Sequence, residues 1–197
     1  MTETVRTFIA LKIPSDLAAA VGDVQRFIKT RAPAGSVRWT RLDHLHLTLM
    51  FLGNVALPDV DPLRERIRAA SARTAALSLE LCGVGCFPDS RNPRVIWVGV
   101  GGEIERLRSL QAAVEAACSE IAGHEERREF SPHLTIGRIK PGDRQGARVG
   151  GAAVEAFKAG TLGRWLAATL HLVRSDLSAE GPRYTDLAEF PLADRSI

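Results

Sequence analysis

Two copies of a four-residue pattern carry the side chains that could perform chemistry in this sequence. His46-Leu-Thr-Leu49 in the first half is echoed by His133-Leu-Thr-Ile136 in the second half. Because an imidazole changes protonation near neutral pH, one neutral and one protonated histidine form a base and an acid. Threonine hydroxyls can donate hydrogen bonds to the oxygens of an anion. If the two copies meet, the set suits in-line attack at phosphorus, without a metal ion or a covalent intermediate.

Each copy lies in a segment with the character of a β-strand, and this fixes the direction of its side chains. Residues i and i+2 of a strand point to the same face. His46 and Thr48 therefore share one face, as do His133 and Thr135, while the residue between them points into apolar packing. A single His-x-Thr is common in strands and is usually structural. Two copies in a chain with five histidines are harder to attribute to chance.

The remaining histidines are interpreted as structural or solvated: His44, His124 and His171. His44 and His46 face the same way in an extended segment and resemble half of a metal site. No third cluster of ligand residues accompanies them in the sequence, so we expect no metal. Phosphate-loop, dinucleotide-binding, HExxH and GxSxG patterns are also absent. These absences argue against ATP-driven enzymes, dehydrogenases, zinc proteases and serine hydrolases, and we expect no cofactor.

Length and composition indicate an ordinary globular chain. The 197 residues are 45% hydrophobic and 25% charged with a net charge of +3, which fits one domain or two small lobes. No apolar run reaches the roughly 20 residues of a membrane helix. The first residues lack the basic segment and apolar core of a signal peptide, so we expect none. Three cysteines without a CxxC pattern indicate neither a disulfide framework nor a zinc site, so we expect the protein in the reducing cytoplasm. Of the 26 basic residues only four are lysines, which fits either a GC-rich genome or an arginine surface selected for phosphate.

Strand and helix signals alternate along the chain, and several strands are joined by short turns. Helices are expected from 14 to about 28, over 61–73 and 103–122, and over a short stretch at 152–158 after a loop at 142–151. The expected strands are 5–12, 37–40, 45–53, 77–87, 94–100, 131–138, 167–175 and 182–190, the last two joined by a turn at 180–181. This order predicts an α+β protein with largely antiparallel sheets.

Several segments around the two motifs resemble a known family. They are Arg6–Leu11, Trp39, Leu45–Gly53, Phe87-Pro88, Pro93–Gly99, Phe130–Arg138 and the tail from Ser175 through Tyr184 to Phe190. In this order they resemble the 2H phosphoesterase superfamily with its HxTx motifs. Within it they resemble the bacterial RNA 2′,3′-cyclic phosphodiesterase family, also called 2′-5′ RNA ligase-like. The resemblance covers nearly the whole chain. Met50 and His44 depart from the residues common in the family, and neither change removes a catalytic group.

The resemblance implies a fold and a reaction. Residues 1–197 would form a single domain of two intertwined, pseudo-symmetric lobes, whose antiparallel sheets are flanked by helices and enclose a cleft. The reaction would open a terminal 2′,3′-cyclic phosphate on RNA to a 2′-phosphate, and members also join or cleave 2′-5′ linkages. By analogy, His133 would activate water and His46 would protonate the leaving 3′ oxygen, although near-symmetric motifs leave the reverse order open. The expected partner is an RNA with such an end or a related nucleotide. The protein is expected to be a cytoplasmic monomer that does not associate with a membrane.

Four further residues are candidates for substrate binding. Arg138 lies in the second motif as the family's arginine does and would clamp the phosphate or the next nucleotide. Five positions from His133, it faces the other way in a regular strand, unless Gly137 allows a bulge. Phe8, Trp97 and Phe130 are candidates to stack on a base, although core packing is the favoured interpretation for all three.

Two other functions stay open at this point. The chain could be a phosphoesterase for small cyclic nucleotides. It could also be a non-catalytic module in which the histidines only hold the phosphate of an RNA end. Turnover of a cyclic phosphate separates the binding module from both enzymes.

Overall fold

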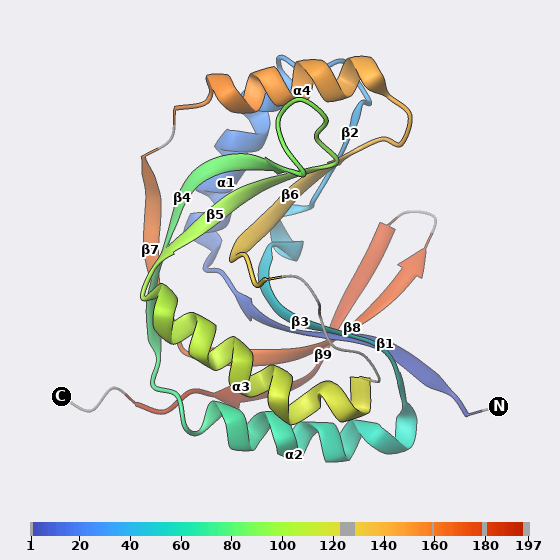
Figure 1. The fold of residues 1–197 in the computed structure, drawn as a ribbon, viewed down its shortest axis with the longest axis vertical. Helices are drawn as coiled ribbons and strands as arrows, with labels where there is room; N and C mark the ends of the chain where they lie inside the picture. Colours follow the sequence, from blue (N-terminus) through green and yellow to red (C-terminus); the bar gives the residue numbers. More distant parts are fainter. Residues whose placement is uncertain (1, 123–128, 159, 179–180, 195–197) are drawn as a thin grey trace.

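The computed structural model describes residues 2–122, 129–158, 160–178 and 181–194. It contains two antiparallel sheets with a pair of helices packed against each (Figure 1). The first sheet has the strand order β3-β1-β8-β9. Its strands are β1 (Thr4–Lys12), β3 (His46–Ala56), β8 (Thr169–Ser178) and β9 (Gly181–Pro191). Helices α2 (Val60–Ser71) and α3 (Ile104–Ala122) pack together beneath it, and we call this unit the first lobe.

The second sheet has the order β2-β6-β5-β4-β7 and forms the second lobe with the other two helices. Its strands are β2 (Val37–Trp39), β4 (Leu77–Phe87), β5 (Val95–Gly102), β6 (His133–Ile139) and β7 (Thr161–Ala167). Helices α1 (Ser15–Lys29) and α4 (Arg144–Ala156) cover its outer face. Short 3-10 helices span Leu42–His44 and Leu57–Asp59. All pairings between these strands are antiparallel, which confirms the expected α+β class.

The chain passes repeatedly between the two lobes. Helix α1 follows β1 of the first sheet but contacts β6 and β7 of the second. Helix α3 follows β5 of the second sheet but contacts β3 of the first. Each lobe is therefore assembled from segments far apart in the sequence, as the colours of Figure 1 show.

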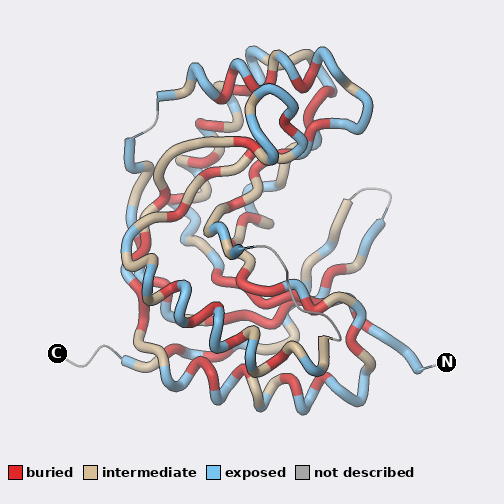
Figure 2. Tube along the Cα trace, viewed as in Figure 1, coloured by how far each residue is buried: buried red, intermediate tan, exposed pale blue. Residues whose placement is uncertain are grey.

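Apolar spacing explains how the helices attach to the sheets. Helix α1 buries four residues at helical spacing, namely Leu17, Val21, Val24 and Ile28. The buried positions of the helices line the sides turned toward the strands, and those of the strands run through the centre of each lobe (Figure 2). Within the described residues, no helix is long and apolar enough to cross a membrane.

The loop expected over residues 142–151 was wrong, because α4 begins at Arg144. The Asp143 carboxylate caps this helix by accepting a hydrogen bond from the backbone N–H of Gly146 at 2.7 Å. The glycines that favoured a loop serve close packing instead. A Cβ atom on Gly151 would lie 1.9 Å from the carbonyl oxygen of Ser90. Tertiary contact therefore outweighs the low helix propensity of glycine here.

Several strands also differ from their expected extents; the strand expected over 167–175, for example, is β8 at Thr169–Ser178. Strand β3 continues through Gly53, whose φ of +71° only glycine adopts easily, and ends at Ala56 rather than at residue 53. Strand β7 was not expected from the sequence, because Gly163 interrupts its alternation and only Trp165 and Ala167 are buried. The expected turn at 180–181 lies partly outside the described residues, and Gly181 already begins β9.

Candidate active site

The two His-x-Thr copies open the strands that face each other across the lobes. His46 is the first residue of β3, and His133 is the first residue of β6. These two strands contact each other, and Figure 1 shows the start of β6 above the first sheet. The structure thus places one histidine-threonine pair at the inner side of each sheet.

Both copies carry the same irregularity directly after the threonine. In β3, Thr48 and Met50 pair with adjacent residues of β1, so Leu49 between them has no partner. In β6, Thr135 and Gly137 pair with adjacent residues of β5, so Ile136 between them has no partner. Such a bulge reverses the alternation of side chains that follows it. The fourth residue of each motif is therefore the bulged one.

The bulge brings Arg138 to the face of His133. From the histidine onward, both strands show the same order of burial: half-buried, buried, half-buried, buried, buried, exposed, buried. Arg138 is the exposed sixth residue of this series in β6, and Phe51 is the exposed sixth residue in β3. The bulge that the sequence allowed near Gly137 is present at Ile136. Arg138 therefore lies on the same face as His133, although it is five positions away.

Backbone carbonyls select the same tautomer for both histidines. The Nδ1 atom of His46 lies 2.7 Å from the carbonyl oxygen of His44. The Nδ1 atom of His133 lies 2.7 Å from the carbonyl oxygen of Ser131. Because a carbonyl oxygen only accepts, each Nδ1 must carry the proton and donate it. When the rings are neutral, both Nε2 atoms therefore carry a lone pair.

The surroundings keep both rings neutral in the free protein. Burial lowers the pKa of His46 to about 4, although the bond to the His44 carbonyl opposes this shift. Burial also lowers the pKa of His133, and the Arg138 guanidinium contributes in the same direction. An anion held between the rings would raise both pKa values, because it stabilises the protonated imidazole. The site therefore gains its acid when an anion binds.

Aromatic rings hold the two imidazoles in place. Phe8 is stacked on His46 with ring centroids 4.7 Å apart, and only 3% of Phe8 is exposed. The edge of Phe87 contacts His133 at 4.9 Å, with Trp97 at 6.4 Å. These contacts favour packing over base stacking for Phe8.

The other two aromatic candidates are also engaged in packing. The ring of Trp97 lies against Gly85, where an added Cβ atom would approach it to 2.3 Å. Phe130 is half-buried and packs against the hydrophobic core. Both therefore have a structural role beside any contact with substrate.

Tyr184, the one tyrosine of the chain, was not singled out from the sequence. Its ring lies 5.3 Å from His46 and 4.8 Å from His44. Burial raises its pKa, whereas the guanidinium groups of Arg138, Arg6 and Arg38 lower it. Tyr184 thus lies between His46 of the first lobe and Arg138 of the second. Its strand was expected, but the pairing that brings it to His46 carries no local sequence signal.

A cavity of about 550 Å³ adjoins His46. It lies within the size range of small-molecule sites. It is bounded by β1, α1, the 3-10 helix before β3, and the strands β8 and β9. Its polar lining residues include Lys12, Ser15, Asp43, His44, Tyr184 and Asp186.

Comparison with known proteins places this arrangement in a family. A protein named RNA 2′,3′-cyclic phosphodiesterase from Aeropyrum pernix is 36% identical over 154 residues, which cover 77% of this chain and 84% of the relative. A protein of the same name from Thermus thermophilus is 32% identical, over 95% of this chain and 90% of the relative.

Solved structures share the fold over nearly the whole chain. A crystal structure of a Thermus thermophilus protein has a TM-score of 0.78 at 26% identity and covers 97% of this chain and 100% of that chain. The structure of E. coli LigT complexed with 3′-AMP has a TM-score of 0.75 at 22% identity, covers 96% and 99%, and shows a likeness of fold. The model of the 2′-5′ RNA ligase superfamily matches residues 13–179. The chain therefore belongs to the 2′-5′ RNA ligase superfamily.

Proposed function

We propose that this protein is an RNA 2′,3′-cyclic phosphodiesterase that opens a terminal cyclic phosphate to a 2′-phosphate. The observation that carries the proposal is the matched pair of histidines, whose Nδ1 atoms both donate to backbone carbonyls and leave both Nε2 atoms for proton transfer. The relatives named for this activity support the choice of substrate. The three cysteines are free, which supports a reducing compartment such as the cytoplasm.

The reaction needs one proton removed and one proton supplied. The Nε2 atom of neutral His133 takes a proton from water as the water oxygen attacks phosphorus. Protonated His46 gives its Nε2 proton to the 3′ oxygen as the bond from that oxygen to phosphorus breaks. The hydroxyls of Thr48 and Thr135 donate to the non-bridging oxygens, on which negative charge grows. Exchange with solvent then restores the starting protonation.

The same steps account for joining of RNA ends. If a sugar hydroxyl replaces water as the nucleophile, the products are a 2′-5′ linkage and a free 3′ hydroxyl. Because the roles of the histidines exchange in the reverse direction, the symmetric tautomers suit both directions.

The exposed ring of Phe51 is a better candidate than Phe8 to stack on a base of the RNA. It is 52% exposed, whereas Phe8 is 3% exposed, and it occupies the position in β3 that Arg138 occupies in β6. Phe51→Ala is expected to raise KM about tenfold with little change in kcat, because stacking on an aromatic ring contributes roughly 1–3 kcal/mol. Steady-state kinetics on a cyclic-phosphate oligonucleotide measure this. The matched control is Leu166→Ala on the edge strand β7, also an exposed apolar residue; equal kinetics for the two variants contradict the role.

The dependence of kcat/KM on pH is expected to be bell-shaped with its optimum below pH 6.5. This ratio reports the free enzyme, in which burial lowers the pKa of both His46 and His133. The singly protonated pair is therefore most abundant on the acidic side of the ordinary histidine pKa. Because the bound phosphate raises both values, the optimum of kcat lies at higher pH. Initial rates between pH 4 and 9 test this, and a kcat/KM that climbs steadily into alkaline pH is incompatible with a protonated acid.

A substrate panel tests the proposed function itself. Oligonucleotides and mononucleotides with 2′,3′-cyclic ends are incubated with the protein in EDTA and without ATP, and the product ends are identified. We expect hydrolysis of the oligonucleotides to 2′-phosphates. Exclusive turnover of the mononucleotides favours the small-cyclic-nucleotide enzyme, and binding without turnover favours an RNA-end binding module. Loss of turnover on chelation, restored by a divalent ion, contradicts the two-histidine mechanism.

A further inference from the structure

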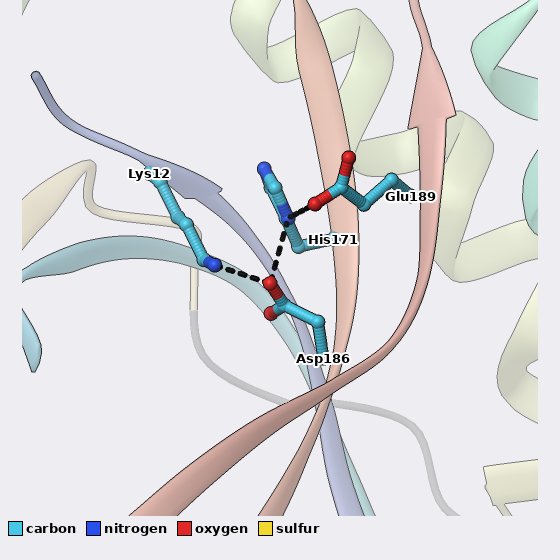
Figure 3. Close-up of polar contacts among 4 residues, drawn as sticks. All are labelled: Lys12, His171, Asp186 and Glu189. Atoms are coloured by element: carbon cyan, nitrogen blue, oxygen red, sulfur yellow. Dashed lines mark hydrogen bonds and ion pairs between the residues drawn. The ribbon is translucent and has the colours of Figure 1, made fainter.

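A second polar cluster lies on the cleft face of the first sheet, beside the cavity that adjoins His46. His171 on β8 is paired with Glu189 on β9, and a bulge at Leu187 turns Asp186 toward the same imidazole (Figure 3). The His171 Nδ1 atom lies 3.6 Å from Asp186 Oδ2 and 3.7 Å from Glu189 Oε1. One ligand atom from each of the three residues lies within 4.8 Å of the others. The sequence hid this cluster because strand pairing, not a short motif, assembles it.

The His171 Nδ1 atom lacks a hydrogen-bond partner in the part of the chain that the structure describes. Its side chain is only 10% exposed, so water cannot freely satisfy it. Both carboxylate oxygens are farther away than the roughly 2.7–3.2 Å of a hydrogen bond from nitrogen. Burial and Lys12 lower the pKa of His171, while Asp186 and Glu189 raise it, and the net shift is downward. The buried nitrogen therefore faces two carboxylates across gaps that a bound group could fill.

We propose that His171, Asp186 and Glu189 bind a divalent transition-metal cation of the zinc type. One imidazole nitrogen and two carboxylate oxygens form a donor set that such ions accept. With bonds of about 2.0–2.2 Å, ligand atoms in a tetrahedral shell lie roughly 3.3–3.6 Å apart. The two observed separations from His171 Nδ1 are close to this spacing. The exposed Glu189 side chain can close the remaining gap, and two carboxylates balance the charge of the ion.

Lys12 competes with the cation for this cluster. Its ammonium group contacts the same Asp186 oxygen that faces His171. Lys12 also lies opposite His46 in the pairing of β1 with β3, and it lines the cavity. A cation at the cluster would displace the Lys12 ammonium group from Asp186. The ammonium group could then extend into the cavity. Removal of the Lys12 charge should therefore strengthen cation binding.

Titration calorimetry with Zn²⁺ on the whole, EDTA-stripped protein at pH 7 tests the site. His171→Gln and Glu189→Gln are each expected to weaken binding at least about tenfold, because each removes a direct ligand. Lys12→Met is expected to tighten binding several-fold. The matched control is His44→Gln, which removes the histidine next to the first motif and is expected to leave this affinity unchanged. Circular dichroism verifies that each variant is folded.

Three outcomes overturn the site. They are unchanged Zn²⁺ affinity in Glu189→Gln, loss of binding in His44→Gln, or weaker binding in Lys12→Met. Because Glu189 is largely exposed, its variant tests the site even if His171→Gln fails to fold. Hydrolysis of the cyclic phosphate is not part of this readout, so the cation site and the proposed function can fail separately.

Discussion

Replacing His46 or His133 by alanine is expected to lower kcat/KM for cyclic phosphate hydrolysis by at least about a hundredfold, as for the loss of a general acid or base. Each variant removes one of the two Nε2 atoms that the backbone carbonyls leave available for proton transfer. Rates on an oligonucleotide with a 2′,3′-cyclic end give the measurement. Because the two histidines act as a pair, the double variant should lose little more than either single variant.

A control variant away from the site separates this loss from a general effect of substitution. Leu166→Ala changes a side chain that is 56% exposed on β7 and does not line the cavity at His46. It should retain activity within about threefold, the scale of a surface substitution. Near-native turnover in either His46→Ala or His133→Ala would show that the two-histidine mechanism is wrong.

Thr48→Val and Thr135→Val are expected to lower kcat by about a hundredfold each while KM changes little. Valine keeps the branched shape of threonine but lacks the hydroxyl. The lost donor would serve charge that grows on the phosphate oxygens in the transition state, and one such donor is worth about 10²–10³ in kcat. Thr48 and Thr135 follow their histidines by two residues on the same strand face, which is the placement that the proposed role requires.

The conservative change to serine distinguishes the hydroxyl from the methyl group. Thr48→Ser and Thr135→Ser keep the donor and should recover most of the activity that valine loses. If the serine variants are as slow as the valine variants, the methyl contacts matter and the hydroxyls are not donors to the phosphate.

The strand placement of the two candidate motifs could be predicted because its signals are local. The two His-x-Thr copies lie within four residues each, and alternation along a strand gives the face that each side chain shares. Arg138 was harder, because its direction depends on the bulge at Ile136, which is seen only in the pairing with β5. Phe51 was not singled out as a stacking residue, whereas the packing interpretation favoured for Phe8 agrees with its burial. Phe8 is covered because β1 lies between β3 and β8.

The remaining parts depend on contacts between distant segments. Tyr184 reaches His46 only because β9 joins the first sheet through β8. Helix α4 contains glycines that predict a loop until the approach of Ser90 to Gly151 is known. Neither the position of a strand in its sheet nor the distance between a helix and a loop has a signature in a short window of sequence.

The exchange of α1 and α3 between the lobes also limits how this protein can be recombined with its relatives. A contiguous stretch taken from a homologue brings strands of one sheet together with a helix that must fit the other sheet. A chimera with a single crossover point between α1 and β7 therefore mixes parental residues in the interiors of both lobes. Functional hybrids should therefore be made by exchanging sets of residues that contact one another in space, rather than contiguous segments of the chain.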